Sequence, residues 1–125
     1  NYVLTQGNIF SYFIFRDELK TGISEKELTD KLVKFIEKVK SSKKYFIAKE
    51  LLSEELASLF NKFLSKAVNS GFIKKTNTGN LQATDKLALT NFRNGKDMRK
   101  KNPYLYHFNQ LKYYFEEFDR FYSEV

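Results

Sequence analysis

The stretch "SGFIKKTNTGNLQATD" at residues 70–85 constrains the fold of this chain more than any other. Two short runs, 72–76 and 81–85, flank the polar tip 77–80. Gly79 in that tip can supply the positive φ that a tight turn needs, so the stretch predicts a β-hairpin. Gly71, just before it, is placed to end a helix in the left-handed conformation. A hairpin after a helix is either the wing of a nucleic-acid-binding domain or a hairpin that closes a core.

Helical patterns precede the hairpin. Residues 5–20 predict a first helix, with a strand as the competing interpretation because the segment is apolar nearly all round. Ser24 and Glu27 have the spacing of a capping box, and the helix that they open carries one apolar stripe. The run 45–47 predicts a small buried strand. Residues 48–70 predict either one continuous helix or two helices with a break near Ser53.

The chain after the hairpin predicts two more helices. Thr84 or Asp85 can cap a helix over 86–94, which Gly95 would end. A polar, basic connector then leads to Asn102 and Pro103, which suit the cap and first turn of a last helix. The apolar positions of that helix follow steps of four and three residues and form a heptad-like seam: Tyr104, Phe108, Leu111, Phe115, Phe118, Tyr122 and Val125.

The composition describes one folded domain. The chain has 125 residues, of which 42% are hydrophobic and none is cysteine, so it is long enough for a core and has no disulfide or thiolate metal site. We expect an intracellular protein, cytoplasmic or nuclear. The longest apolar run, 9–15, is too short to span a membrane.

The positive charge is unevenly distributed. The net charge is +7; residues 74–101 contribute +6, residues 1–73 contribute +3 and residues 102–125 contribute −2. The excess therefore lies on the hairpin and on the segment that follows it. Such a concentration favours an anionic partner.

The order helix, helix, short strand, helical segment and hairpin resembles a winged-helix domain, with the exit phrase at residues 67–74. With its capped helix and terminal helix, the region 24–125 is similar to repressors of the PadR and MarR type. The resemblance implies a mainly α fold with a small β-hairpin (α+β): a winged-helix-like domain over 1–101 and a long C-terminal docking or dimerisation helix over 102–125, with dimerisation favoured. The chain departs from the usual helix-turn-helix pattern in residues 48–70, because the turn of that motif often contains glycine and this segment has none.

A fainter resemblance connects the chain to the C-terminal region of bacterial membrane-bound glycerol-3-phosphate acyltransferases. It depends on short phrases at residues 23–24, 28–35, 45–47, 55–56 and 71–73. The catalytic His-x4-Asp of that family does not occur in this chain. This resemblance would imply an accessory domain without chemistry of its own.

The winged-helix resemblance predicts a non-enzymatic module that binds nucleic acid, most simply duplex DNA. Lysine and asparagine on the helix before the hairpin are side chains that read base edges, and the hairpin lysines and the following basic segment would hold phosphates. The predicted residues are Asn61, Lys62, Ser65, Lys66, Asn69, Lys74, Lys75, Arg93, Lys96, Arg99, Lys100 and Lys101. The alternative is a protein-interaction or accessory domain, which the absence of arginine from 56–92 favours.

The sequence contains no catalytic or cofactor signature. His107 is the only histidine, and without a second imidazole or a thiol it predicts no metal site. Adjacent carboxylates such as Glu116 and Glu117 diverge by about 100° on a helix and form no dyad. We therefore expect no cofactor, and a protein partner or second copy at the C-terminal seam.

Overall fold

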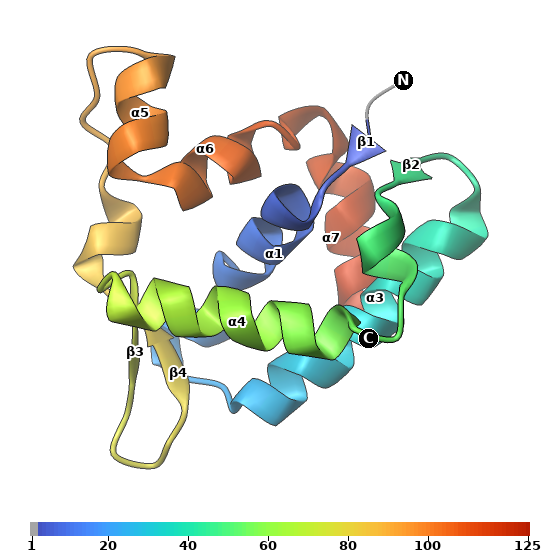
Figure 1. Cartoon of the computed structure of the whole chain (residues 1–125), viewed down its shortest axis with the longest axis horizontal. Helices are drawn as coiled ribbons and strands as arrows, with labels where there is room; N and C mark the ends of the chain where they lie inside the picture. The colour runs from blue at the N-terminus through green and yellow to red at the C-terminus, as the bar shows by residue number, and fades with distance from the viewer. Residues whose placement is uncertain (1–2) are drawn as a thin grey trace.

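In the computed structural model, which describes residues 3–125, helix α1 (Gln6–Ile14) runs through the middle of the molecule (Figure 1). Thr5 caps it by accepting from the Asn8 amide at 3.2 Å, and all residues from 8 to 14 are buried. The all-round apolar pattern is thus that of a central helix. The helix does not continue to Lys20 as expected, because a turn separates it from the short helix α2 (Glu18–Thr21).

Helix α3 (Glu25–Ser42) confirms the helix that was predicted to begin after Ser24. The Ser24 hydroxyl accepts from the Glu27 amide at 3.1 Å and satisfies one of the free amides of the first turn. Its predicted stripe is buried throughout: Leu28, Leu32, Phe35, Ile36 and Val39. This face packs against α4 and α7.

Segments far apart in the sequence form a small parallel pair. Strand β1 (Val3–Leu4) pairs with β2 (Phe46–Ile47), and Val3 lies opposite Phe46. The strand expected at 45–47 therefore exists, but its expected burial is wrong, because Phe46 is 59% exposed at the edge of the pair. A 3₁₀ turn, η1 (Lys49–Leu52), follows, and the chain bends at Ser53 before helix α4 (Leu56–Asn69). Of the two alternatives for 48–70, the structure has the broken one.

The predicted hairpin consists of β3 (Ile73–Lys75) and β4 (Leu81–Ala83), which are antiparallel with Ile73 opposite Ala83. Gly71 and Gly79 have φ values of +83° and +84°, as their places before the hairpin and in its tip require. Ile23, between α2 and α3, adds an isolated antiparallel bridge to Leu81. The fold is therefore mainly α with a small antiparallel sheet.

The chain after the hairpin differs from the prediction in two places. The expected helix over 86–94 is only a 3₁₀ turn, η2 (Asp85–Ala88), and Gly95 begins helix α5 (Gly95–Lys101) instead of ending a helix. The expected long terminal helix over 102–125 is two helices, α6 (Pro103–Asn109) and α7 (Phe115–Ser123), joined by the 3₁₀ turn η3 (Lys112–Tyr114). Asn102 caps α6 as predicted, since its side chain accepts from the Leu105 amide at 3.1 Å.

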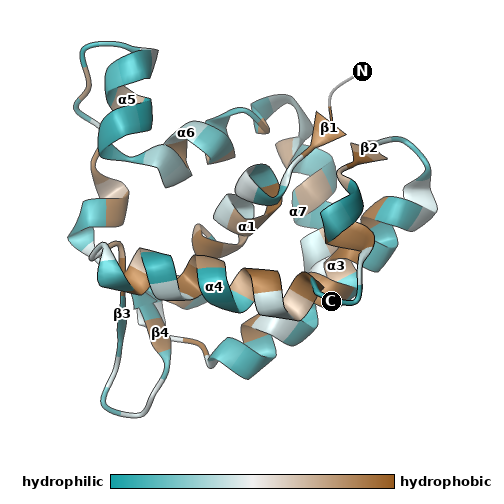
Figure 2. Ribbon diagram, viewed as in Figure 1, coloured by the Kyte–Doolittle hydropathy of each residue, from teal (hydrophilic) through white to brown (hydrophobic). Residues whose placement is uncertain are grey.

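The aromatic seam packs on the core of its own chain. Tyr104, Leu111 and Phe118 are buried, and the other four seam residues are partly buried. Figure 2 shows hydrophobic, brown segments on α1, α3 and α7. The Phe108 ring stacks at 4.6 Å on the rings of both Phe15 and Phe115. The heptad-like apolar pattern had favoured a dimer seam. In the structure, contacts of α6 with α1 and of α7 with α3 account for that pattern. Within residues 3–125, none of the helices is long and apolar enough to cross a membrane.

Candidate nucleic-acid interface

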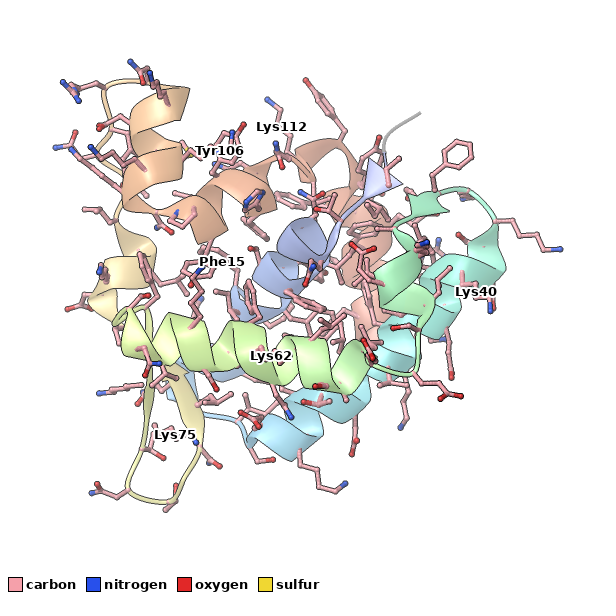
Figure 3. The ribbon with its side chains drawn as sticks, in the orientation of Figure 1. Phe15, Lys40, Lys62, Lys75, Tyr106 and Lys112 are labelled. Atoms are coloured by element: carbon pink, nitrogen blue, oxygen red, sulfur yellow. The ribbon has the colours of Figure 1, made fainter. Side chains whose placement is uncertain are left out.

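Helix α4 separates its apolar and polar residues onto opposite faces. Its buried residues are Leu56, Phe60, Leu64 and Ala67, which recur at the spacing of one helix face. The predicted contact residues lie on the outer face and are all exposed: Asn61, Lys62, Ser65, Lys66 and Asn69. Figure 3 shows Lys62 on the outside of α4. These side chains are therefore positioned by a helix that the core holds in place.

The hairpin extends from the C-terminal end of α4. The chain turns there through hydrogen bonds of 3.0 Å from the Gly71 amide to the Val68 carbonyl and from the Phe72 amide to the Ala67 carbonyl. Lys74 and Lys75 on β3 are exposed, and Figure 3 shows Lys75 on the projecting part of the molecule. In the tip, the Thr76 amide donates to the Asn80 carbonyl at 2.7 Å.

Hydrogen bonds tie the hairpin to neighbouring segments both beside its tip, at Leu81, and at its base. The Ile23 and Leu81 backbones exchange hydrogen bonds of 3.0 and 2.7 Å. The Thr84 hydroxyl donates to the Gly71 carbonyl at 2.6 Å. Lys86, which was not predicted as a site residue, donates to the Ser70 carbonyl at 2.7 Å and lies 4.5 Å from the centre of the Phe72 ring. Lys86 is therefore a positioning residue for the hairpin.

Helix α5 is organised around a carboxylate that the prediction missed. Asp97 is only 6% exposed. It accepts from the Arg93 amide at 3.1 Å and pairs with the Arg93 and Lys101 side chains at 3.3 Å. The backbone hydrogen bond from Arg93 is the main cause that lowers the pKa of Asp97, and the side-chain donors add to it. Asn94 caps the helix and lies three residues before Asp97, which is the spacing of a capping box. This spacing was the sequence signal that could have predicted the start of α5.

The remaining cations of α5 make no ion pair with Asp97. Lys96, Arg99 and Lys100 are exposed, and the Arg99 guanidinium lies 5.4 Å from the Tyr106 ring centre. The basic segment that was expected to be a connector is thus a helix with a fixed display of positive charge.

Fewer cations are paired with an acid in this region than elsewhere: outside it, six of the twelve lysine and arginine residues make an ion pair within residues 3–125. Residues 56–101 contain ten lysine and arginine residues and two aspartates. Of those ten cations, the structure pairs only Arg93 and Lys101 with an acid, and both share Asp97. The other eight make no ion pair within residues 3–125. Positive charge left unpaired over neighbouring elements is the electrostatic property expected of an anion-binding surface.

The structure brings some of the predicted residues together and separates others. Helix α4 contacts β3, so the α4 and hairpin lysines lie on adjoining elements. The hairpin and α5 lie towards opposite ends of one edge of the molecule, with η2 between them (Figure 1). Helix α5 packs on α6 and therefore belongs to a separate part of this edge.

Within residues 3–125 there is no group of three histidine, cysteine or acidic side chains that could hold a metal ion. The His107 ring contacts Gln110, with 3.3 Å between Nδ1 and Oε1, and the same Gln110 oxygen accepts from the buried Asn8 amide nitrogen at 2.9 Å. His107 is therefore part of the packing between α6 and α1.

The chain matches neither a protein-family model, nor a curated protein sequence, nor a solved structure. The geometry and charge described above are accordingly the basis for a functional proposal.

Proposed function

We propose that this protein is a non-enzymatic module that binds duplex nucleic acid, most simply DNA, through the outer face of α4, the hairpin and α5. The observation that carries the proposal is the set of seven cations on these three elements that make no ion pair within residues 3–125: Lys62, Lys66, Lys74, Lys75, Lys96, Arg99 and Lys100. Binding to phosphates would release counterions, which is the main sequence-independent source of affinity for DNA.

The winged-helix interpretation belongs to this proposal. Its support is the order of α1, α3, α4 and the hairpin, together with the bridge from Ile23 to Leu81, which places a third extended segment beside β4. In such an arrangement α4 would present Asn61, Lys62 and Lys66 to base edges while Lys74 and Lys75 held the backbone.

A direct test measures the affinity for a duplex at increasing salt. Fluorescence anisotropy with a labelled duplex of about 20 base pairs should give an affinity that falls steeply as salt rises. The plot of log K against log salt has a negative slope, to which each phosphate contact contributes about −0.9. Lys74→Gln with Lys75→Gln should therefore make this slope less steep by about 1.8.

The matched control removes the same charge elsewhere. Lys34 and Lys40 on α3 are exposed and make no ion pair within residues 3–125, and Figure 3 shows Lys40 on the far side of the molecule from Lys75. Lys34→Gln with Lys40→Gln should leave the slope close to that of the unaltered protein. The proposal fails if the unaltered protein binds no duplex or single strand at low ionic strength.

A protein-interaction or accessory module is the second candidate, and one observation favours it. Asn61 on the outer face of α4 lines a shallow hollow with Glu25, Lys26 and Asp30 of α3. Lys26 pairs with Asp30 at 2.9 Å, so the N-terminal half of the proposed contact face borders a mixed group of charges with one acid in excess. The absence of arginine from 56–92 points the same way. Recovery of one stoichiometric protein partner without nucleic acid would decide for this candidate, and the C-terminal helices remain a proposed contact for such a partner or a second copy.

A further inference from the structure

A pocket of about 300 Å³ lies between the end of α1, α2 and the base of the hairpin. Phe15, Ala83 and Leu87 contribute to its apolar wall, and Arg16, Lys20 and Asp85 contribute charged groups. Its size is at the lower end of the range for small-molecule sites, so an occupant would be small.

The charged groups of this pocket have hydrogen-bonding capacity left over. Arg16 uses Nε for the Tyr12 carbonyl at 2.9 Å and Nη1 for Asp119 at 3.0 Å, and its guanidinium carbon lies 3.6 Å from the centre of the Tyr12 ring. Within residues 3–125 its Nη2 makes no hydrogen bond. Lys20 pairs only with Asp17, at 3.2 Å between two highly exposed side chains. The Asp85 carboxylate makes no hydrogen bond or ion pair within the same range. Donors and a free acceptor therefore line one pocket.

We infer that this pocket binds a small zwitterion with an apolar body, namely an α-amino acid such as leucine or phenylalanine. The ligand carboxylate would meet Arg16 and Lys20, its ammonium would meet Asp85, and its side chain would lie against Phe15 and Leu87. A purely apolar ligand would desolvate these charges without pairing them. A simple anion would face the unpaired carboxylate of Asp85 without a group to pair with it.

The test compares phenylalanine with 3-phenylpropionate, which lacks the ammonium, and with phenethylamine, which lacks the carboxylate. Calorimetric titration of the full chain should show phenylalanine binding about tenfold more tightly than either analogue, as expected for one charge-assisted hydrogen bond. Lys20→Gln should weaken phenylalanine and 3-phenylpropionate and leave phenethylamine unchanged. Asp85→Asn should weaken phenylalanine and phenethylamine and leave 3-phenylpropionate unchanged.

Two controls make the outcome decisive. Lys26, like Lys20, is exposed and paired with a nearby aspartate, at 2.9 Å from Asp30, so Lys26→Gln should alter none of the three affinities. Ala88→Phe, which places a bulky ring on the exposed rim of the pocket, should abolish phenylalanine binding with the thermal midpoint retained. Absence of saturable binding, or equal affinities for the three ligands, overturns the inference; it does not depend on nucleic-acid binding.

Discussion

The C-terminal region and the region 56–101 use their charged side chains in opposite ways. On α7, Glu117 pairs with Lys44 at 2.6 Å and with Arg120 at 3.1 Å. Asp119 pairs with Arg16 at 3.0 Å and accepts from the Tyr12 hydroxyl at 2.5 Å. Over residues 56–101, by contrast, most of the cations have no acid beside them.

This difference separates residues that hold the fold from residues that remain available to a partner. The charges of α7 lie around an aromatic core and connect it to α1 and to the end of α3, so their interactions are satisfied within the chain. The lysines of α4 and the hairpin project from elements whose other faces are already packed. Changes on the aromatic side should therefore alter stability, and changes on the basic side should alter binding.

The largest expected effect is loss of the fold at alkaline pH. Burial, together with hydrogen bonds to Asp119, Glu117 and Glu18, raises the pKa of Tyr12, Tyr45 and Tyr122, and burial raises the pKa of Tyr104. Because the folded pKa values exceed the unfolded value of about 10, this stabilisation is fully present below pH 10. It is lost as pH rises through the folded values.

We therefore expect the free energy of unfolding to fall from about pH 10 upward and the chain to unfold cooperatively. Tyrosinate absorbance should rise for these four tyrosines together with the loss of helical circular dichroism. Their ionisation in a chain that keeps its helical signal would contradict the prediction.

At the acid end, lysine and tyrosine donors lower the pKa of Glu117. The contribution of Glu117 to the free energy of unfolding is therefore present above about pH 4.3 and is lost as pH falls.

The next effect is a cavity in the aromatic core. Phe118 is fully buried and contacts the rings of Tyr12, Phe35 and Tyr45. Phe118→Ala should lower the free energy of unfolding by about 3–5 kcal/mol, measured by urea denaturation. Phe46 on β2 is the matched control, because its side chain is largely exposed, and Phe46→Ala should change the same quantity by less than about 1 kcal/mol. Similar losses for both variants would mean that the core is not centred on Phe118.

A smaller loss is expected at the partly buried end of the seam. Phe115 stacks on Phe108 but keeps some exposure. Phe115→Glu should cost about 2 kcal/mol, because a charge is placed against an aromatic surface. Sedimentation analysis should show the mass unchanged, since the stacking partner is in the same chain. A drop to half the mass with helical content preserved would instead support the proposed second copy.

The C-terminal segment from α6 to α7 shows how much of the structure could be predicted from the sequence. Steps of four and three residues predict a continuous helix, but two short helices joined by a 3₁₀ turn produce nearly the same steps, because side chains three apart overlap in a 3₁₀ turn. The apolar pattern therefore identified the buried residues from Tyr104 to Phe118 without locating the break at η3. Phe121, buried beside them, lies outside that pattern.

Local signals succeeded where a cap and an apolar stripe agreed, as at Ser24 and in α3. They failed at α5, whose only long apolar side chain is Met98, so that its cap at Asn94 had no periodic pattern to support it. The candidate site shows the same difference between features set by local sequence and features set by tertiary contacts. Exposure of Lys62 and Lys74 could be predicted from helix and hairpin patterns, whereas the ties from Lys86 to Ser70 and from Tyr12 to Asp119 depend on tertiary contacts.

The smallest effect on stability should come from the residues with the largest expected effect on binding. Lys74 and Lys75 are exposed on β3, follow one another in sequence, lie opposite the uncharged residues Gln82 and Leu81, and form no ion pair within residues 3–125. Replacing both with glutamine should change the free energy of unfolding by no more than about 0.5 kcal/mol, and relief of like-charge repulsion makes a slight gain as reasonable as a loss. Urea denaturation and duplex affinity should be measured on the same preparation.

If the pair of substitutions lowers the free energy of unfolding by an amount comparable to Phe118→Ala, the hairpin lysines stabilise the fold, and the contrast between the two regions fails. If stability stays and salt-dependent affinity falls, these charges serve a partner outside the chain.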